Sequence, residues 1–394
     1  MGAASLLGPA MVAAIAYVDP GNIATTAVAG STRGFQLAGV VLGASLLGIP
    51  VQALAAKVAL ATGGDLAGVC GRELPGIARV LLWAVAEVMV MATDVAEVVG
   101  ASLGLSLLLG IGMLQAGALT ATASVALLAL RRHRPRWFEA AMGMTIVMLG
   151  ALSVQQLLLA GHPATQAMPV GGGAAVPGLA FLAAGIIGAT VMPHAIFLQS
   201  ALITARARHR PPHSPGAAYR RAWVDTGMAL GAAGLVNVLM LVVAAVALHG
   251  SGAPVAGLPE FWQRLRDLAG PMAGHLFAVA LVVSGLASAS VGTLAGEVVM
   301  AGLLRRRVRP MARRLVTLLP SLAVLAAGVP ATPALLGSQV VLSLTLPCAL
   351  VPLIWVTHSR RLMGDLANRR VTTVAAAAGS AVVVSVAVWA VLGG

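Results

Sequence analysis

The sequence predicts an all-α protein that crosses a membrane eleven times, and three observations predict it: composition, apolar stretches of spanning length, and the side on which basic residues fall. Of 394 residues, 59% are hydrophobic and only 9% are charged, whereas about 25% of residues are charged in an average soluble domain. The mean hydropathy is +0.94. A chain of this length has room for about 11 to 13 apolar helices of roughly 20 residues. These values exclude an ordinary soluble protein and predict a single transmembrane domain over residues 1–394.

Apolar stretches of spanning length divide the whole chain. Between them lie an uncharged Gly- and Pro-rich segment at 161–178, expected as a flexible external loop, and a segment at 258–268, expected as an amphipathic surface helix. Three GxxxG pairs, Gly39/Gly43, Gly100/Gly104 and Gly292/Gly296, predict close helix packing. The expected spans are 3–31, 37–60, 80–103, 107–130, 138–160, 177–203, 224–248, 274–303, 315–331, 335–357 and 371–392.

Basic residues predict the orientation of the chain. Short cytoplasmic loops hold an excess of Lys and Arg, and all 25 Lys and Arg residues except Arg33, Arg264 and Arg266 fall in one alternate set of connections. We therefore expect a cytoplasmic N-terminus and an external C-terminus, in a bacterial inner membrane. The basic residues occur in short runs between apolar stretches, so the lipid bilayer is the expected partner; neither nucleic acid nor an obligate protein partner is inferred.

The first span contains a strong helix breaker beside polar residues. Its middle reads Asp19-Pro20-Gly21-Asn22. Proline removes a helical donor and clashes with the preceding turn, and glycine loosens the backbone further. A charged residue at the bilayer centre costs about 2.5–3.5 kcal/mol, and irregular backbone survives there only when it faces protein or water. The helix is therefore predicted to break at a polar site.

The sixth span contains a matching break. Here Pro193 lies mid-span between Met192 and His194. Spans 1–5 and spans 6–10 form two sets of five, which cover residues 1–160 and 177–357. Because each set has an odd number of spans, the two halves lie in opposite orientations in the membrane. Residues 371–392 form an extra eleventh helix. Interrupted first helices in two inverted halves point to a transport site at the membrane midplane.

These motifs together resemble the Nramp family of divalent-metal transporters. The likeness rests on Asp19 to Asn22, on Met192-Pro193-His194 and on Ala92-Thr93-Asp94-Val95-Ala96-Glu97, and it continues through Gly292 to Gly296 and Ser338 to Val341. The resemblance implies a LeuT-type fold with helices 1 and 6 broken, and proton-coupled uptake of Mn²⁺, Fe²⁺ and similar ions. Glu297 departs from the family pattern, in which glutamine is expected, and its role stays open.

The residues at the breaks offer a mixed set of metal ligands. Hard oxygen ligands suit Mg²⁺, Ca²⁺ and Mn²⁺, whereas a thioether is soft, so the mixture favours Mn²⁺, Fe²⁺, Co²⁺ or Cd²⁺ as the transported substrate. The order of Mn²⁺ and Fe²⁺ stays open, and no cofactor is expected. The resemblance implies these ligands: the side chains of Asp19, Asn22 and Met192, the carbonyls of Ala189 and Ala16, and Gln339 on occlusion.

The third span carries three acidic residues on one helix face. Glu87, Asp94 and Glu97 are spaced so that all three share a face rising roughly 15 Å. Such a stripe fits a proton relay, and the alternative is a set of buried ion pairs with Arg313 or Arg314. The resemblance makes Asp94 and Glu97 proton-pathway residues.

Of the eight histidines, His194 alone lies mid-span. From the residues alone it could be a ligand, a proton carrier or a core donor; the resemblance favours proton coupling, with Asp19 as first proton acceptor.

Three other classes of protein fit these residues less well than metal transport does. A sodium-coupled symporter of a small organic solute could use hydroxyls such as Ser284 and Thr293, but Asp19 would repel an amino-acid carboxylate. A metal channel would differ in conducting without saturation or proton coupling. An intramembrane enzyme is disfavoured because no HExxH motif and no Ser/His/Asp or Cys/His constellation stands out.

Overall fold

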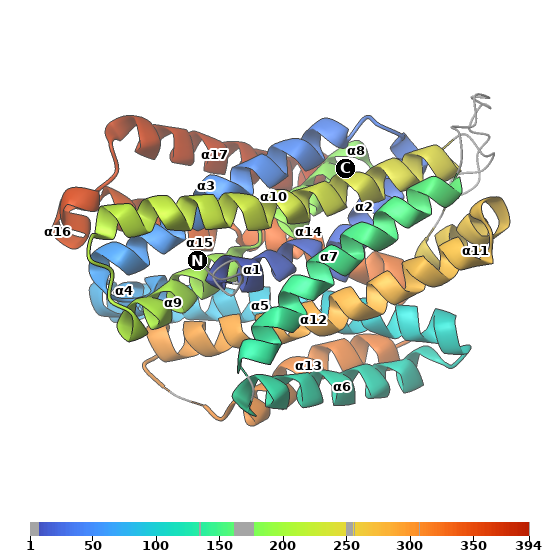
Figure 1. Ribbon diagram of the computed structural model, residues 1–394, viewed down its shortest axis with the longest axis horizontal. Helices are drawn as coiled ribbons and strands as arrows, with labels where there is room; N and C mark the ends of the chain where they lie inside the picture. Colours follow the sequence, from blue (N-terminus) through green and yellow to red (C-terminus); the bar gives the residue numbers. More distant parts are fainter. Residues whose placement is uncertain are drawn as a thin grey trace.

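The computed structural model describes residues 8–133, 135–160, 177–249, 255, 257–306 and 308–393, and within them every regular element is a helix. Figure 1 shows that the long helices run roughly side by side along one direction of the molecule, as spans of a membrane bundle do. The expected external loop falls largely on residues 161–176, which lie outside the described residues.

Eight helices, counting the two broken or kinked pairs as single spans, are long and apolar enough to cross a membrane. The three other predicted spans are helical too. The first half of the chain contains α1 (Pro9–Ile15), η2 (Ala16–Val18), α2 (Pro20–Arg33), α3 (Ala38–Thr62), α4 (Leu66–Glu73), α5 (Gly76–Leu109), α6 (Met113–His133) and α7 (Pro135–Ala160). The second half contains α8 (Leu179–Thr190), α9 (Pro193–His209), α10 (Pro215–Leu248), α11 (Leu258–Ala269), α12 (Pro271–Leu303), α13 (Pro310–Ala326), α14 (Ala331–Thr345), α15 (Pro347–His358), α16 (Arg360–Met363), η3 (Gly364–Leu366) and α17 (Arg370–Gly393).

These elements agree with the predicted spans, with two differences. The amphipathic surface helix is present as α11, but α4 is a short additional helix that the apolar pattern did not predict. The tenth span divides at Leu346 into α14 and α15 because Pro347 cannot continue the helical hydrogen bonds. Leu346 keeps a right-handed helical conformation, so this point is a kink rather than an unwound break.

The GxxxG prediction is right for two pairs and wrong for one. A Cβ on Gly104 would lie 2.6 Å from the carbonyl oxygen of Ala278. A Cβ on Gly292 would lie 3.2 Å from the Glu97 carboxylate, and one on Gly296 would collide with the Arg313 guanidinium. Glycine therefore lets α5 and α12 approach closely. No atom lies within 4 Å of the corresponding positions on Gly39 and Gly43, so that pair faces open space, and the motif alone does not specify a neighbour.

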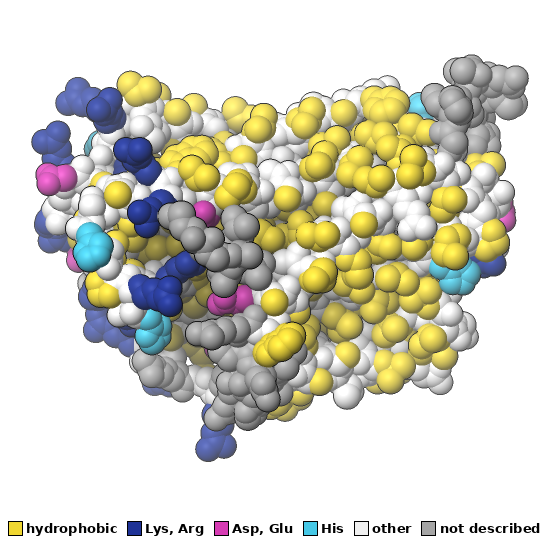
Figure 2. Space-filling view, viewed as in Figure 1, with side chains coloured by type: hydrophobic (Ala, Val, Ile, Leu, Met, Phe, Trp, Pro, Cys, Tyr) yellow, Lys and Arg dark blue, Asp and Glu magenta, His cyan; other side chains and the backbone are white. Residues whose placement is uncertain are grey.

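The two ends of the bundle differ in charge. Figure 2 shows Lys and Arg side chains gathered at the end where Figure 1 places α4 and α16, with an apolar surface over the middle of the molecule. This is the distribution that the assignment of basic residues to alternate connections predicts.

Candidate metal site and buried charge network

The first span is broken between Ile15 and Pro20. Helix α1 ends at Ile15, a single turn of 3₁₀-helix follows, and α2 begins at Pro20. Asp19 adopts an extended conformation and caps α2, because its Oδ1 accepts a hydrogen bond of 2.8 Å from the backbone N–H of Asn22. Proline suits the first helical position, where no donor is needed. The same residues that stop α1 therefore start α2.

The sixth span is broken at Val191 and Met192. Helix α8 ends at Thr190, and α9 begins at Pro193 with Met192 as its extended N-cap residue. Met192 and His194 are both fully buried. Both predicted breaks are thus confirmed as interruptions of the backbone.

Asn22 joins the two breaks. Its Nδ2 donates to Asp19 Oδ1 over 2.8 Å and to the carbonyl oxygen of Ala189 over 2.6 Å. Ala189 belongs to the last turn of α8, directly before the second break. An amide N–H₂ therefore lies between a carboxylate oxygen and a main-chain oxygen, both of which were predicted as metal ligands. These two oxygens converge on one point from opposite halves of the chain.

The oxygen of Asn22 is held by two residues that sequence reasoning missed. Thr190 Oγ1 donates to Asn22 Oδ1 over 3.2 Å, and Asn237 Nδ2 donates to it over 3.3 Å and to the carbonyl oxygen of Tyr17 over 2.8 Å. Asn237 is an amide in the middle of the seventh span, and that exception to an apolar pattern was the available signal. Asn237 thus supports both the unwound turn and the side chain of Asn22.

The second oxygen of Asp19 is buried and has no hydrogen-bond partner. Within the described part of the chain, no ion pair includes Asp19. A buried carboxylate oxygen without a partner is costly. Asp19 therefore offers an unpaired anionic oxygen at the break, and a cation would compensate for it.

Gln339 on α14 lies against the same turn. A Cβ added to Gly21 would collide with the Gln339 side-chain amide and lie 2.9 Å from Asp19 Oδ2. Glycine at this position is what lets Gln339 approach, and Gln339 Oε1 is buried without a partner. The predicted Asp19, Asn22, Ala189 and Gln339 are therefore brought together.

The two remaining predicted ligands lie within the breaks. Ala16 is the first residue of η2, and Met192 is the buried N-cap residue of α9. The described residues contain no group of three His, Cys, Asp or Glu that could hold a metal. A metal at the breaks would rely on one carboxylate together with amide, carbonyl and thioether ligands.

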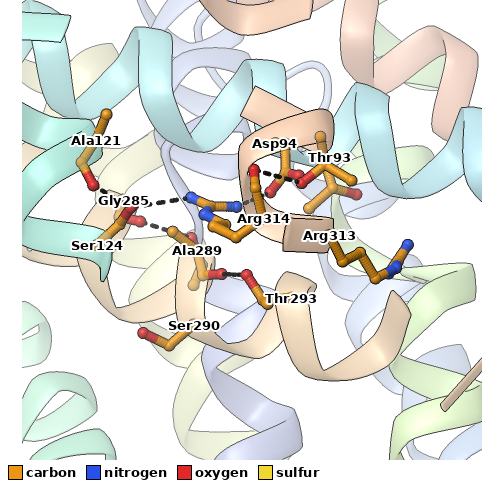
Figure 3. Close-up of polar contacts among 12 residues, drawn as sticks. Thr93, Asp94, Ala121, Ser124, Gly285, Ala289, Ser290, Thr293, Arg313 and Arg314 are labelled. Carbon is orange, nitrogen blue, oxygen red and sulfur yellow. Dashed lines mark hydrogen bonds and ion pairs between the residues drawn. The ribbon is translucent and has the colours of Figure 1, made fainter. Parts of the chain in front are cut away.

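Two of the three acids on α5 form ion pairs with α13. Arg313 Nη2 lies 2.8 Å from Glu87 Oε2, and Arg314 pairs with Asp94. Figure 3 shows Arg314 between Asp94 and Ser124, with the Arg313 side chain directed elsewhere. Ser124 Oγ on α6 accepts from Arg314 Nη2 over 3.3 Å. The ion-pair alternative is thus realised for Glu87 and Asp94, and each arginine has its own acid.

Glu97 is the exception on this face of α5. Both of its carboxylate oxygens are buried without hydrogen-bond partners, and both lie 3.2 Å from where a Cβ on Gly292 would be. The carboxylate interacts electrostatically with Asp94, Arg314 and Asp19. Glu97 is therefore within electrostatic range of both the Asp19 carboxylate at the first break and the Asp94–Arg314 ion pair.

His194 contacts α5 through a threonine. Its Nδ1 lies 3.2 Å from Thr93 Oγ1, and Thr93 Oγ1 also donates to the carbonyl oxygen of Met89 over 3.0 Å. Since the hydroxyl hydrogen is used for Met89, Nδ1 carries the hydrogen of the imidazole in this arrangement. Nε2 is then a buried basic nitrogen without a partner. Thr93 lies inside the motif at 92–97 but was not predicted as a site residue.

Broken helices that meet at buried polar groups inside an apolar bundle define the class of membrane transporters with the LeuT-type fold. Solved structures of this class have a similar fold. The chain aligns with Mhp1, a nucleobase-cation-symport-1 family transporter, with a TM-score of 0.59 at 15% identity, over 98% of this chain and 90% of Mhp1. At this identity the likeness concerns the fold alone.

The family follows from closer relatives. The model of the Nramp family, described as natural resistance-associated macrophage protein-like, matches residues 10–393. The divalent metal cation transporter MntH of Bacillus subtilis (strain 168) is 41% identical over 374 residues, covering 93% of this chain and 87% of that protein. MntH of Deinococcus radiodurans is 40% identical, covering 98% and 90%. The manganese transporter of Eremococcus coleocola, solved in complex with an aromatic bis-isothiourea substituted compound, aligns with a TM-score of 0.86 at 28% identity over 98% of this chain and 85% of its own. The chain belongs to the Nramp family.

Proposed function

We propose that the protein imports Mn²⁺ and similar divalent transition metals, including Fe²⁺, Co²⁺ and Cd²⁺, into the cytoplasm by proton-coupled alternating access. The observation that carries this proposal is the contact of Asn22 with both Asp19 and Ala189, because it brings ligands from two separate breaks to one point. The relatives described as divalent metal cation transporters support the class of substrate.

The proposed metal site uses Asp19, Asn22, Met192 and the carbonyl of Ala189, with Ala16 and Gln339 contributing in some states. Asn22 at present directs its amide nitrogen toward the two oxygens. To bind a cation it would rotate and present Oδ1. The hydroxyl of Thr190, which now donates to Oδ1, could then accept from the rotated Nδ2, whereas Asn237 Nδ2 would keep only its bond to the carbonyl oxygen of Tyr17. The unpaired oxygen of Asp19 supports this assignment, since a divalent ion would supply its missing partner.

The proposed proton path runs from Asp19 to Glu97 and Asp94, and then along α5 to Glu87. Its support is that Glu97 lies close enough to both Asp19 and Asp94 to interact electrostatically with them. Arg314 and Arg313 hold the two inner acids, and His194 contributes a basic nitrogen at the start of the path. Entry of metal and a proton from outside would neutralise the carboxylates and allow the halves 1–160 and 177–357 to hinge at the breaks, with 371–392 outside the repeat.

The proposed orientation places the arginine-rich end in the cytoplasm, with the N-terminus inside, the C-terminus outside and the protein in the bacterial inner membrane. The charge difference between the two ends supports it. A sodium-coupled symporter of an organic solute is less well supported, because a carboxylate with an unpaired oxygen occupies the first break.

The test is metal uptake in proteoliposomes with a panel of divalent ions and an imposed pH gradient. We expect saturable uptake of Mn²⁺ and Cd²⁺, competition among transition metals, and faster uptake when the outside is acidic. Uptake that depends on Na⁺ and not on pH would contradict proton coupling, and conductance without saturation would indicate a channel.

A further inference from the structure

A cavity of ≈ 430 Å³ opens at the arginine-rich end of the molecule, apart from the breaks. It lies between the start of α1, the second half of α9 and the first turns of α10. Cavities of this size accommodate small organic molecules. None of the proposed metal ligands or proton-path residues lines it.

Three arginines converge on this cavity. Arg206 and Arg210 lie one helical turn apart at the end of α9, and Arg221 comes from α10. One carboxylate, Asp225, lines the same cavity, one turn beyond Arg221. Asp225 interacts electrostatically with Arg206 and Arg221. One carboxylate does not balance three guanidinium groups, so the lining keeps an excess of positive charge that an anionic ligand would compensate.

The convergence is more specific than the general basic character of this end. Arg208 and Arg220 are neighbours of the lining arginines in sequence and are also exposed, yet neither lines the cavity. Arg206 is in the last turn of α9, Arg210 follows directly after the end of that helix, and Arg221 is in the second turn of α10. Of these five arginines, the cavity is lined by Arg206, Arg210 and Arg221.

The inner part of the cavity is built from buried polar groups and apolar walls. Gln199 is 1% exposed, and its Nε2 donates to Thr226 Oγ1 over 3.3 Å while its Oε1 has no partner. The walls include Pro9 and Ile203. Gln199 Oε1 is itself closed off, so the exposed guanidinium groups are the polar groups that a ligand in the cavity would meet.

We propose that this cavity binds an organic phosphate. The phosphate lies among Arg206, Arg210 and Arg221, since guanidinium groups bind phosphate oxygens in a bidentate manner, and the rest of the ligand extends toward the buried end lined by Gln199. A glycerol phosphate group has this chemistry, either as a free ester or as the headgroup of an anionic lipid. Because Pro9 belongs to α1, a bound ligand contacts the first half of the first broken helix as well as α9.

The test is calorimetric titration of the detergent-solubilised full chain with two probes, glycerol 3-phosphate and dihexanoyl phosphatidylglycerol below its critical micelle concentration. We expect saturable binding of at least one probe. Arg206→Gln with Arg221→Gln should weaken binding at least about tenfold, because charge-assisted hydrogen bonds are lost. The matched pair Arg208→Gln with Arg220→Gln removes the same charge and should change affinity less than about twofold.

The pattern of binding identifies the source of the phosphate. Binding of the lipid probe alone indicates a headgroup site, and binding of glycerol 3-phosphate alone indicates a free ester. Absence of saturable binding of both probes, or equal weakening in the two double variants, overturns the proposal. If the lining pair fails to fold, Arg206→Lys with Arg221→Lys keeps the charge but loses the planar fork; affinity should then fall at least about threefold, and unchanged affinity overturns the site.

Discussion

Two buried polar regions of this protein compensate their carboxylates differently. At the breaks, Asp19 accepts hydrogen bonds from Asn22 and keeps one unpaired oxygen. On α5, Glu87 and Asp94 each face an arginine of α13. A carboxylate paired with arginine has a permanent counter-charge, whereas one held by an amide has room for a transient cation. The difference separates a proposed cargo site from a fixed charge network.

The largest expected effect is on Asp19. Asp19→Ala removes the only anionic ligand proposed at the breaks, so Mn²⁺ uptake into proteoliposomes should fall at least about a hundredfold. Asp365→Ala is the matched control, since Asp365 is an exposed carboxylate at the arginine-rich end. Uptake by Asp19→Ala at the rate of the control would refute the site.

The second-largest effect is expected on the free energy of unfolding, when the buried ion pair between Arg314 and Asp94 is broken. Arg314→Gln leaves Asp94 without its counter-charge, and breaking a buried pair costs about 3–5 kcal/mol. Arg361→Gln breaks the pair with Glu73, in which the arginine side chain is 74% exposed, and such pairs contribute about 0–1 kcal/mol. Thermal unfolding in detergent measures both. Adding Asp94→Asn to Arg314→Gln should recover part of the loss, and equal destabilisation by the two single arginine variants would contradict the comparison.

Proton movement should depend on Glu97, which lies between the two regions, and on its neighbour Asp94. Asp94→Asn keeps the shape of the side chain but cannot carry a proton. We expect metal uptake to continue at a reduced rate while acidification of the liposome lumen is lost, as followed by a pH-sensitive dye. Normal acidification in step with metal flux would exclude Asp94 from the path.

The smallest effect on Mn²⁺ uptake is expected at Met192. Met192→Ala removes a soft ligand and leaves the oxygen ligands, so Mn²⁺ uptake should persist within about tenfold. Ca²⁺ or Mg²⁺ should then compete with Mn²⁺, which they should not do in the wild type. Unchanged selectivity would show that the sulfur does not discriminate among ions.

Residues that violate a local rule could be recognised from the sequence. Pro20 and Pro193 inside apolar stretches predicted both breaks, and acids spaced along the third span predicted its buried polar face, because such exceptions need a reason. The pairing partners could not be recognised. Asn22 and Ala189 are 167 residues apart, and Thr93 and His194 are 101 apart, so only the folded chain identifies them.

Local sequence motifs did not predict packing where it depends on which helix lies beside the motif. Gly39/Gly43 has the same spacing as Gly100/Gly104, yet only the second pair packs against another helix. The sequence likewise left open which arginine of α13 pairs with which acid, since Arg313 and Arg314 are adjacent and point in different directions. Asn237, the second support of Asn22, was visible as an amide within an apolar span and was overlooked.

The most direct test of the proposed ion site is X-ray absorption at the cadmium edge, with Cd²⁺ bound to the wild type and to Met192→Ala. Coordination between the two breaks predicts one sulfur neighbour alongside oxygen neighbours in the wild type, with the sulfur lost and the oxygens retained in the variant. A wild-type spectrum with oxygen neighbours alone, or identical spectra from the two proteins, would contradict it.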